Sequence, residues 1–342
     1  MTEKMIHMIE FRAMGCQVNV QLEADKSGAV ILSYVPEQVE AIEAQLTRFR
    51  PDSDLMRFNA RAGEFVQVGE VLYENMRAAK HTALLTNGLY NPLILPAMLA
   101  NGYDRSFETI DHVEATPTIP VLDWHDIELR PSTHEIKIPA GSAVDLGGIA
   151  KGWATGNLAD ALAQYGACLV NIGGDMTGRG TPGDLPGWLI EIEDPFTHDV
   201  FETVFLHNMS ITTSGTDFRR WNDKQGNRYH HIINPYTGNC ADTDVVSVTV
   251  LHPNAPIAEA YCKAVLLKGA EAGLNWLNHQ WHTAGLVFKK DGAVLATSTL
   301  TPLSMKGLLS YETFRTLNHT FDAVRRRISR DGTDKSRSHH AE

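Results

Sequence analysis

The sequence lacks several features that define common protein classes. No run of about 18 apolar residues occurs in the chain, so we expect no membrane-spanning helix. The 4 cysteines show no Cys-x-x-Cys spacing, and reduced thiols in apolar surroundings are the expected state. Basic residues number 30 against 41 acidic ones, and the net charge of -11 argues against a nucleic-acid partner.

Targeting and common nucleotide-binding motifs are missing as well. The amino terminus has neither a continuous apolar core nor a small-residue cleavage site, so we expect no signal peptide and a cytoplasmic protein. No Gly-rich loop ends in Gly-Lys-Ser or Gly-Lys-Thr, as a Walker A loop does. Residues 178–183 match Gly-x-Gly-x-x-Gly, but a Pro-rich stretch and a strand-like pattern follow where the dinucleotide fingerprint requires a helix.

What remains is the composition of a globular enzyme, with 43% hydrophobic and 21% charged residues. Apolar residues alternate within 5–23, which predicts a pair of strands, and recur every three or four positions over 35–49, which predicts an amphipathic helix. Further segments are expected as helices (53–59, 72–83, 151–165 and 258–268) and as strands (167–172, 188–193, 203–206, 245–251 and 284–288).

This mixture of hairpin-like strands with a few helices predicts a single globular unit of the α+β class with mixed or antiparallel sheets. The pattern turns polar and basic near residue 325. We therefore expect one domain over residues 5–322 and a disordered basic tail over residues 323–342.

A Gly-rich turn between a predicted strand and a predicted helix is the strongest local signal. It contains Asp145, Gly147, Gly148 and Lys151 within residues 144–153. Adjacent glycines let a ligand approach the backbone, and the N–H groups that begin a helix favour a phosphate. Lys151 adds a positive charge, which makes the turn a candidate anion site. The alternative is a purely structural turn, because such turns also occur in α/β proteins that bind no phosphate.

Four separated segments, taken together, carry a family resemblance. They are Met14-Gly15-Cys16; residues 48–55 with Asn59; the turn 145–152 with residues 171–175; and Thr213-Ser214-Gly215 followed by His231-Ile232-Ile233-Asn234-Pro235-Tyr236-Thr237-Gly238. In order and spacing, over about residues 9–300, they resemble the ApbE-type flavin transferases, the FAD:protein FMN transferase family.

The resemblance implies a single α+β unit that binds FAD in a cleft. Enzymes of this family use Mg²⁺, split the FAD pyrophosphate, release AMP and join FMN through a phosphoester to a Thr hydroxyl of a target protein. By position, the resemblance implies that the FAD pocket is lined by Met14, Asn59, Asp145, Gly147, Gly148 and Lys151. It places Thr213, Ser214, Gly215 and His231 by the pyrophosphate or the attacking hydroxyl.

His231 is the candidate general base, because an unperturbed imidazole titrates near neutrality. The alternative is a histidine that is only hydrogen-bonded on a strand, as most of the 15 histidines must be. His230 is expected on the opposite face of that strand. Asp145 could lie beside a metal or cap the turn, and a structural, FAD-organising role is favoured.

The sequence departs from the family where the resemblance implies metal-binding or acidic groups. Tyr90-Asn91-Pro92-Leu93 replaces Phe-Asp-Pro-Thr, and Asn234 replaces an Asp. On the predicted helix 258–268, Glu259 and Lys263 replace the Asp and Thr that supply oxygens to Mg²⁺. A charged Lys cannot ligate a cation.

Two arrangements are therefore open at this position. In the first, a displaced Mg²⁺ is held by Glu259, the Ala150 carbonyl and the FAD phosphates. In the second, the Lys263 ammonium neutralises the pyrophosphate directly and pairs with Glu259 at spacing i, i+4.

Three functions are compatible with these residues. The leading one is FMN transfer from FAD to a protein Thr, with FAD and an acceptor protein as partners. The alternatives are an FAD-binding carrier without transfer activity, and an FAD pyrophosphatase that uses water as the nucleophile. The chain carries no acceptor-like Ser/Thr-Gly-Ala-Thr motif, so self-modification is not expected.

Overall fold

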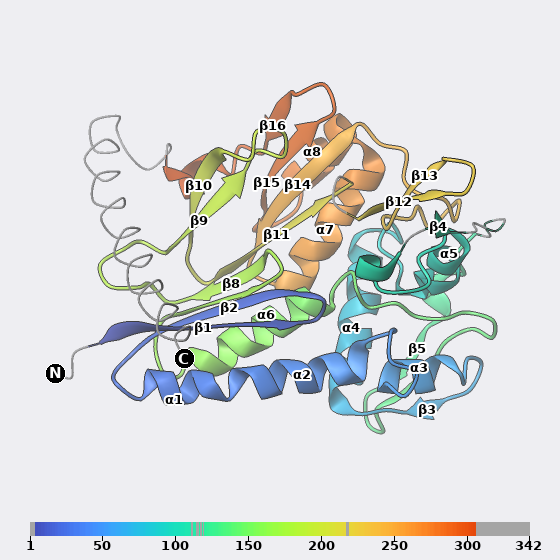
Figure 1. The fold of residues 1–342 in the computed structure, drawn as a ribbon, viewed down its shortest axis with the longest axis horizontal. Coiled ribbons are helices and arrows are strands. Elements are labelled where there is room, and N and C mark those ends of the chain that lie inside the picture. Colours follow the sequence, from blue (N-terminus) through green and yellow to red (C-terminus); the bar gives the residue numbers. More distant parts are fainter. Residues whose placement is uncertain are drawn as a thin grey trace, which may run out of the picture.

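The computed structural model describes residues 4–305 apart from 111, 114, 115, 117, 119, 217 and 218. An eight-stranded sheet with the order β1-β2-β7-β8-β11-β14-β15-β16 crosses the molecule (Figure 1). All its neighbouring strands run antiparallel. The strands are β1 (Met5–Ala13), β2 (Cys16–Ala24), β7 (Cys168–Ile172), β8 (Asp175–Arg179), β11 (Met209–Gly215), β14 (Val245–His252), β15 (Ala284–Lys289) and β16 (Val294–Ala296).

The first hairpin is closed by a two-residue turn that reaches toward the site. Ala13 pairs with Cys16, and the two residues between them have positive φ, 52° at Met14 and 66° at Gly15. Positive φ at both positions is the backbone of a type I′ turn, whose twist suits a tight hairpin. The sequence pattern had predicted this strand pair, and the structure confirms it.

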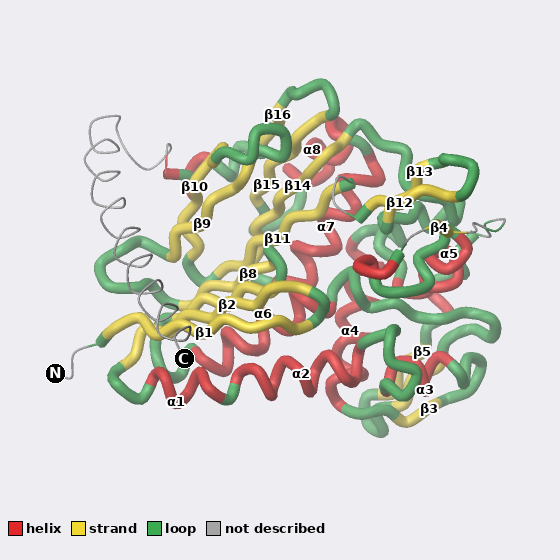
Figure 2. Tube along the Cα trace, viewed as in Figure 1, coloured by secondary structure: helices red, strands yellow, loops and turns green. Residues whose placement is uncertain are grey.

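Helices cover one face of the sheet, as Figure 2 shows for the helices beneath the β1–β2 hairpin. Inward-facing Val18, Val20 and Leu22 of β2 share a buried core cluster with Val39 and Leu158. Burial of this apolar area drives the packing. The covering helices are α1 (Gly28–Ser33), α2 (Val35–Leu46), α6 (Ala150–Leu162), α7 (Ala255–Lys268) and α8 (Ala270–Asn278).

A two-stranded hairpin of β9 (Trp188–Glu193) and β10 (Val200–Leu206) forms a separate sheet that lies against the main one (Figure 1). Its alternating apolar residues Trp188 and Ile190 share a core cluster with Ile211 and Phe288 of the sheet. The alternating apolar residues that predicted a strand here are therefore the ones on the buried face of the hairpin.

A further group of elements packs beside the sheet, at the right of Figure 1. Its core gathers Leu72, Met76, Ile136 and Leu146, so the long helix α4 contacts the segment that precedes the Gly-rich turn. These elements are α3 (Asp54–Asn59), β3 (Val66–Gln67), α4 (Glu70–Leu85), η1 (Pro92–Ile94), α5 (Leu95–Ala100), η2 (Phe107–Thr109), β4 (His112–Val113), η3 (Trp124–Asp126), β5 (Glu128–Arg130), β6 (Glu135–Lys137), β12 (Arg220–Asp223) and β13 (Arg228–His230); η4 (Thr301–Leu303) follows the last strand of the main sheet.

These elements confirm the α+β class and the predicted long helices. Helices α1, α5 and α8 were not predicted. Residues 178–183 form the end of β8 and a loop, and no helix follows them, as expected. All four cysteines are free thiols. Among the described helices, none combines the length and apolar character needed to cross a bilayer. The predicted end of the domain at residue 322 and the basic tail lie outside the described residues.

Candidate functional site

A cavity of about 840 Å³ lies where the sheet meets the group of elements around α4. Its walls come from the β1–β2 turn, the segment after α2, the Gly-rich turn before α6, the β9 strand, the end of β11 and one face of α7. Segments that are far apart in the sequence thus meet around one space large enough for a dinucleotide. Of the predicted site residues, this lining includes Met14, Asp145, Gly147, Gly148, Ala150, Lys151, Thr213, Ser214, Gly215, His231, Glu259 and Lys263.

Asp145 holds the Gly-rich turn in shape. Its Oδ1 accepts the Gly147 N–H at 2.8 Å, and its Oδ2 lies 3.0 Å from Nε of Arg48. Both side chains of this ion pair are almost fully buried, with exposed fractions of 10% and 5%. Asp145 therefore caps the turn and pairs with a cation, which is the structural role that the sequence favoured.

Arg48 lies between two aromatic rings at the cavity wall. Its Cζ is 4.3 Å from the ring centroid of Phe49 and 4.4 Å from that of Tyr103. Its Nη2 is buried and has no hydrogen-bond partner among the described residues. The guanidinium thus offers an unused donor at the cavity wall, while its faces are already in contact with the rings of Phe49 and Tyr103.

Asn59 has a different position from the one that the resemblance implied. Its side chain does not line the cavity but forms two hydrogen bonds with the backbone of Val144. Nδ2 donates to the carbonyl at 2.9 Å and Oδ1 accepts the N–H at 2.8 Å. Asn59 therefore fixes the backbone at Val144, in a segment that is not a strand although one was predicted there.

Lys151 lines the cavity, and its ammonium pairs with the buried carboxylate of Asp175. Burial raises the pKa of Asp175 despite the attraction of Lys151. Burial would lower the pKa of Lys151, but the charges of Asp175 and Glu259 outweigh it and raise that pKa. Lys151 consequently stays a cation that is already partly neutralised within the protein.

The end of β11 presents the predicted Thr213-Ser214-Gly215 segment to the cavity. Thr213 Oγ1 lies 2.9 Å from Thr249 Oγ1 on the adjacent strand β14, and Ser247 also lines the space. A hydroxyl can donate or accept, so this patch can adapt to phosphate oxygens or to an incoming alcohol.

His231 faces the cavity, whereas His230 does not line it and bonds the Ala241 carbonyl at 3.0 Å. The two neighbouring side chains therefore point to different sides of the backbone, as predicted. His231 is hydrogen-bonded to the backbone of Arg219, and its buried Nδ1 has no partner among the described residues. Burial, with the positive charges of Arg219 and Lys263, lowers the pKa of His231 from 6.5 to about 3.

Helix α7 brings Glu259 and Lys263 to the cavity on one face, one turn apart. The Lys263 ammonium lies 3.4 Å from Glu259 Oε1 and 3.2 Å from its carbonyl oxygen. The neighbouring Cys262 instead lies in the core against Thr212. The predicted i, i+4 pair therefore exists, and position 263 is the one that faces the site.

The residues at this position do not fit a Mg²⁺ ion, which prefers about six oxygen ligands. Glu259 Oε2 already accepts the Gly152 N–H in the first turn of α6, at 3.2 Å. Glu259 Oε1 faces the Lys263 ammonium, which would repel a cation. Across the part of the chain that the structure describes, no three His, Cys, Asp or Glu side chains gather where they could hold a metal.

The two amide side chains that stand where the family has carboxylates form hydrogen bonds with backbone groups. Asn91 donates to the Leu122 carbonyl at 3.0 Å, which a carboxylate could not do, and accepts from the Leu93 N–H at 3.0 Å. Asn234 accepts from the Tyr236 N–H at 2.9 Å in a tight turn. In both residues the amide oxygen is thus engaged by a backbone N–H.

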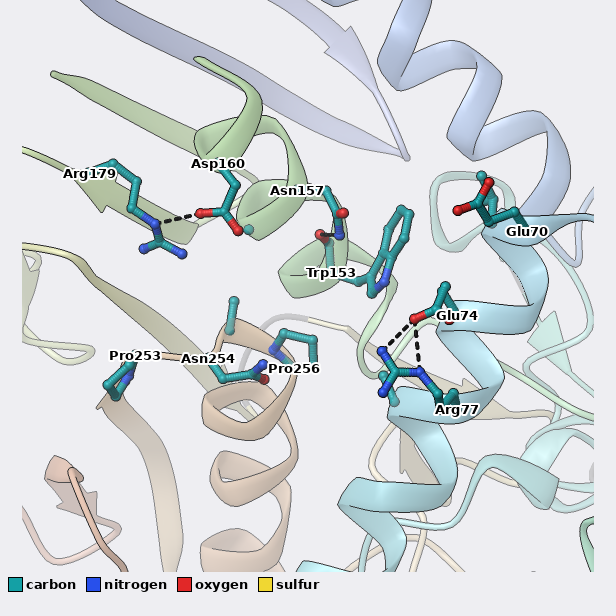
Figure 3. A pocket seen from close by; sticks show the side chains of 14 residues that line it. Glu70, Glu74, Arg77, Trp153, Asn157, Asp160, Arg179, Pro253, Asn254 and Pro256 are labelled. Atoms are coloured by element: carbon teal, nitrogen blue, oxygen red, sulfur yellow. Dashed lines mark hydrogen bonds and ion pairs between the residues drawn. The ribbon is translucent and has the colours of Figure 1, made fainter. Parts of the chain in front are cut away.

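A second cavity, of about 350 Å³, opens between α4, α6 and the start of α7 (Figure 3). Four of its five charged lining groups form two ion pairs, and Glu70 is the fifth. Nε of Arg77 lies 2.9 Å from Glu74, and Nε of Arg179 lies 2.7 Å from Asp160. The larger cavity, with its unpartnered buried donors, is therefore the better candidate for a ligand site.

Several lining residues were not predicted as site residues. Tyr90 and Arg48 stood in recognised segments, but their side chains had no assigned role, while Tyr103 and Arg219 carried no local signal. The β9 residues Ile190 and Ile192 were predicted only as part of a strand. Long-range packing alone brings these positions to the site.

Comparison with known proteins agrees with this geometry. The model of the ApbE family matches residues 14–287, so the chain belongs to the ApbE family. It is 29% identical to the FAD:protein FMN transferase of Treponema pallidum over 75% of this chain and 77% of that protein. It is 31% identical to the FAD:protein FMN transferase of Vibrio cholerae over 69% of this chain and 72% of that protein.

Solved structures agree on the fold. The crystal structure of the ApbE protein from Thermotoga maritima superposes with a TM-score of 0.79 at 23% identity. The match covers 87% of this chain and 99% of that one.

Proposed function

We propose that this protein transfers the FMN moiety of FAD to a Thr hydroxyl of an acceptor protein and releases AMP. The observation that supports this most is the cavity of about 840 Å³, because nearly every residue that the family resemblance assigned to FAD lines it. The names of the relatives support the same activity.

In the proposed reaction the Thr oxygen attacks the phosphorus of the FMN half of FAD. A new P–O bond forms to the Thr, and the bond from that phosphorus to the bridging oxygen breaks. The bridging oxygen leaves with AMP. The proton of the Thr hydroxyl must go to a base and finally to AMP or water.

His231 is the proposed base, with the proton received at Nδ1. Because the backbone of Arg219 engages the other ring nitrogen, Nδ1 is the ring nitrogen left without a partner among the described residues. Burial and the positive charges of Arg219 and Lys263 lower the pKa of His231 and make it a weak base without substrate. The negative charge of a bound pyrophosphate would raise its pKa toward neutrality, so substrate binding itself would activate the base.

The remaining residues would bind and orient the substrate. The Gly-rich turn, with Lys151 and Lys263, would receive the pyrophosphate, and Thr213 and Ser214 would hydrogen-bond the phosphate or the incoming hydroxyl. Met14 at the β1–β2 turn would contact the flavin. Such positioning of reacting groups is a main source of rate enhancement.

The two alternative functions use the same cavity. A carrier would bind FAD without breaking it, and an FAD pyrophosphatase would place water where the Thr oxygen attacks. The acceptor is proposed to be a separate protein, and the cytoplasmic location remains a prediction from the sequence.

Product analysis separates the three functions. The protein is incubated with FAD and a peptide that carries a Thr, and flavins, AMP and peptide mass are measured. Transferase activity predicts equal amounts of AMP and of peptide heavier by one FMN. Free FMN with AMP indicates hydrolysis, and intact FAD with a competent natural acceptor indicates a carrier.

A further inference from the structure

Tyr90 carries a buried hydroxyl that nothing in the described structure satisfies. The residue is 5% exposed, lines the large cavity, and its Oη has no hydrogen-bond partner among the described residues. A buried unpaired hydroxyl costs about 1–3 kcal/mol, so its presence calls for a ligand. Burial, with the charges of Glu259 and Asp145, raises the pKa of Tyr90 well above its ordinary value, so the group is a permanent donor.

Lys263 and Tyr90 approach the same point of the Gly-rich turn. A Cβ built on Gly148 would lie 2.9 Å from Lys263 Cε and 3.0 Å from Tyr90 Cε2. The glycine thus leaves room for two side chains that come from α7 and from the segment after α4. An ammonium and a phenol are both hydrogen-bond donors, and both suit phosphate oxygens.

Positive groups gather beside the Gly-rich turn. Lys151, Lys263 and Arg219 line this part of the cavity, and Asp175 and Glu259 each lie beside one of the two lysines. The rest of the wall carries both signs, with Arg48 and Arg50 as well as Glu43, Asp145, Glu191 and Glu193. The first N–H groups of α6 begin at this turn and add the positive end of a helix dipole. A pyrophosphate at the turn would therefore meet three cationic side chains and these N–H groups.

We propose that the Tyr90 hydroxyl and the Lys263 ammonium together bind the pyrophosphate of the dinucleotide, so that the protein holds this substrate without a divalent metal. The proposal rests on the proposed function only in taking FAD as the ligand. Lys263 supplies the charge, and Tyr90 supplies a neutral donor that keeps its proton. Neither group requires the carboxylate ligands that a magnesium site would need.

The first test compares FAD binding to the wild-type protein in EDTA and in millimolar Mg²⁺, measured by calorimetry. The proposal predicts dissociation constants within about twofold of each other. A loss of about tenfold or more in EDTA would overturn it. Because this comparison uses the unaltered protein, it does not depend on the folding of any variant.

The second test measures FAD and riboflavin binding to Lys263→Thr and Tyr90→Phe in EDTA. Charged and neutral hydrogen bonds to phosphate predict losses of FAD affinity of about tenfold or more for Lys263→Thr and about threefold to tenfold for Tyr90→Phe. Riboflavin lacks the pyrophosphate, so its affinity should stay within about twofold. Unchanged FAD affinity in both variants, or equal losses for riboflavin, would overturn the proposal.

Matched controls come from the same helix. Tyr261→Phe removes a hydroxyl that bonds Gln280 outside the cavity, and Lys268→Thr removes an ammonium that lies over the Trp276 ring. Both should bind FAD as the wild type does. Mg²⁺ should restore part of the lost FAD affinity in Lys263→Thr alone, because a Thr hydroxyl can ligate a cation and an ammonium cannot. If Mg²⁺ does not change the FAD affinity of this variant, the position of Lys263 at the pyrophosphate is contradicted.

Failure of this inference and failure of the proposed function give different results. If wild-type protein binds no FAD under either condition, the proposed function fails and the inference fails with it. If FAD binds but needs Mg²⁺, or binds without regard to positions 90 and 263, only the inference fails.

Discussion

The carboxylate of Glu259 joins two helices, because Oε2 accepts the Gly152 N–H of α6 at 3.2 Å while Oε1 lies 3.4 Å from the Lys263 ammonium on α7. The side chain is 3% exposed, so both contacts are shielded from water. The same residue therefore caps the helix that begins at the Gly-rich turn and fixes the cation that faces the cavity.

Replacing Glu259 with Ala should lower the free energy of unfolding by about 2–4 kcal/mol, since it leaves a helix N–H and an ammonium without partners. Glu259→Gln keeps an acceptor oxygen and should lose about half as much. Urea unfolding measures both. Exposed Glu271 in the first turn of α8 is the control, and Glu271→Ala should change stability by less than about 0.5 kcal/mol. Equal effects at the two positions would refute the bridging role.

Gly148→Ala should weaken FAD binding by about tenfold or more, because the new methyl group would press on Lys263 and Tyr90. At Gly156, on the helix α6 that follows the turn, an added methyl group would have nothing within 4 Å. Gly156→Ala should therefore leave binding unchanged and raise stability by about 0.5–1 kcal/mol. Fluorescence titration with FAD compares the two variants, and unaltered affinity in Gly148→Ala would contradict the described packing.

Asn59→Ala should destabilise the protein by about 2 kcal/mol, because both backbone groups of Val144 lose their partners. FAD affinity should fall as well, since the segment leading to Asp145 loses its anchor. Exposed Asn157, which bonds a carbonyl of its own helix, provides the matched Asn157→Ala control. Thermal unfolding with and without FAD checks the prediction, and a variant as stable as the control would refute the anchoring role.

His231 should make stability depend on pH in acid. The unfolded chain binds a proton near 6.5, whereas the folded chain resists protonation until about pH 3. The unfolded state therefore binds more protons between these values, and stability falls as pH falls, by at most about 1.4 kcal/mol per pH unit. His231→Gln lacks this titration. Urea unfolding from pH 7 to pH 4 should give a shallower slope for the variant, and parallel slopes would contradict the burial of a neutral imidazole.

Local sequence patterns predicted the parts of the fold that depend on local physics. The alternation in 5–23 and the three-four spacing after Val35 correspond to β1, β2 and α2, and Ser53 caps α3 as its residue type suggests. Short helix α1 escaped prediction because it has only six residues and no side-chain cap. A helix of six residues without a capping side chain leaves no pattern in the sequence that distinguishes it from its neighbours.

The site could be predicted where residues lie in contiguous motifs and not where packing unites distant segments. The glycines and Asp145 of the turn lie close together in the sequence. The convergence of Tyr90 and Lys263 on Gly148 depends on how α7 packs against α4 and α6, which no local pattern specifies. For Asn59 the motif was recognised from the sequence, but the contacts were not. Its side chain bonds the backbone of Val144 instead of lining the cavity.

The most direct test of this account is a crystal structure of the protein with FAD, grown in EDTA. The account predicts FAD in the cavity of about 840 Å³, with pyrophosphate oxygens within hydrogen-bond distance of Lys263 Nζ and Tyr90 Oη and His231 beside the FMN phosphorus. FAD bound elsewhere, such as in the cavity of Figure 3, or a pyrophosphate turned away from α7, would contradict it.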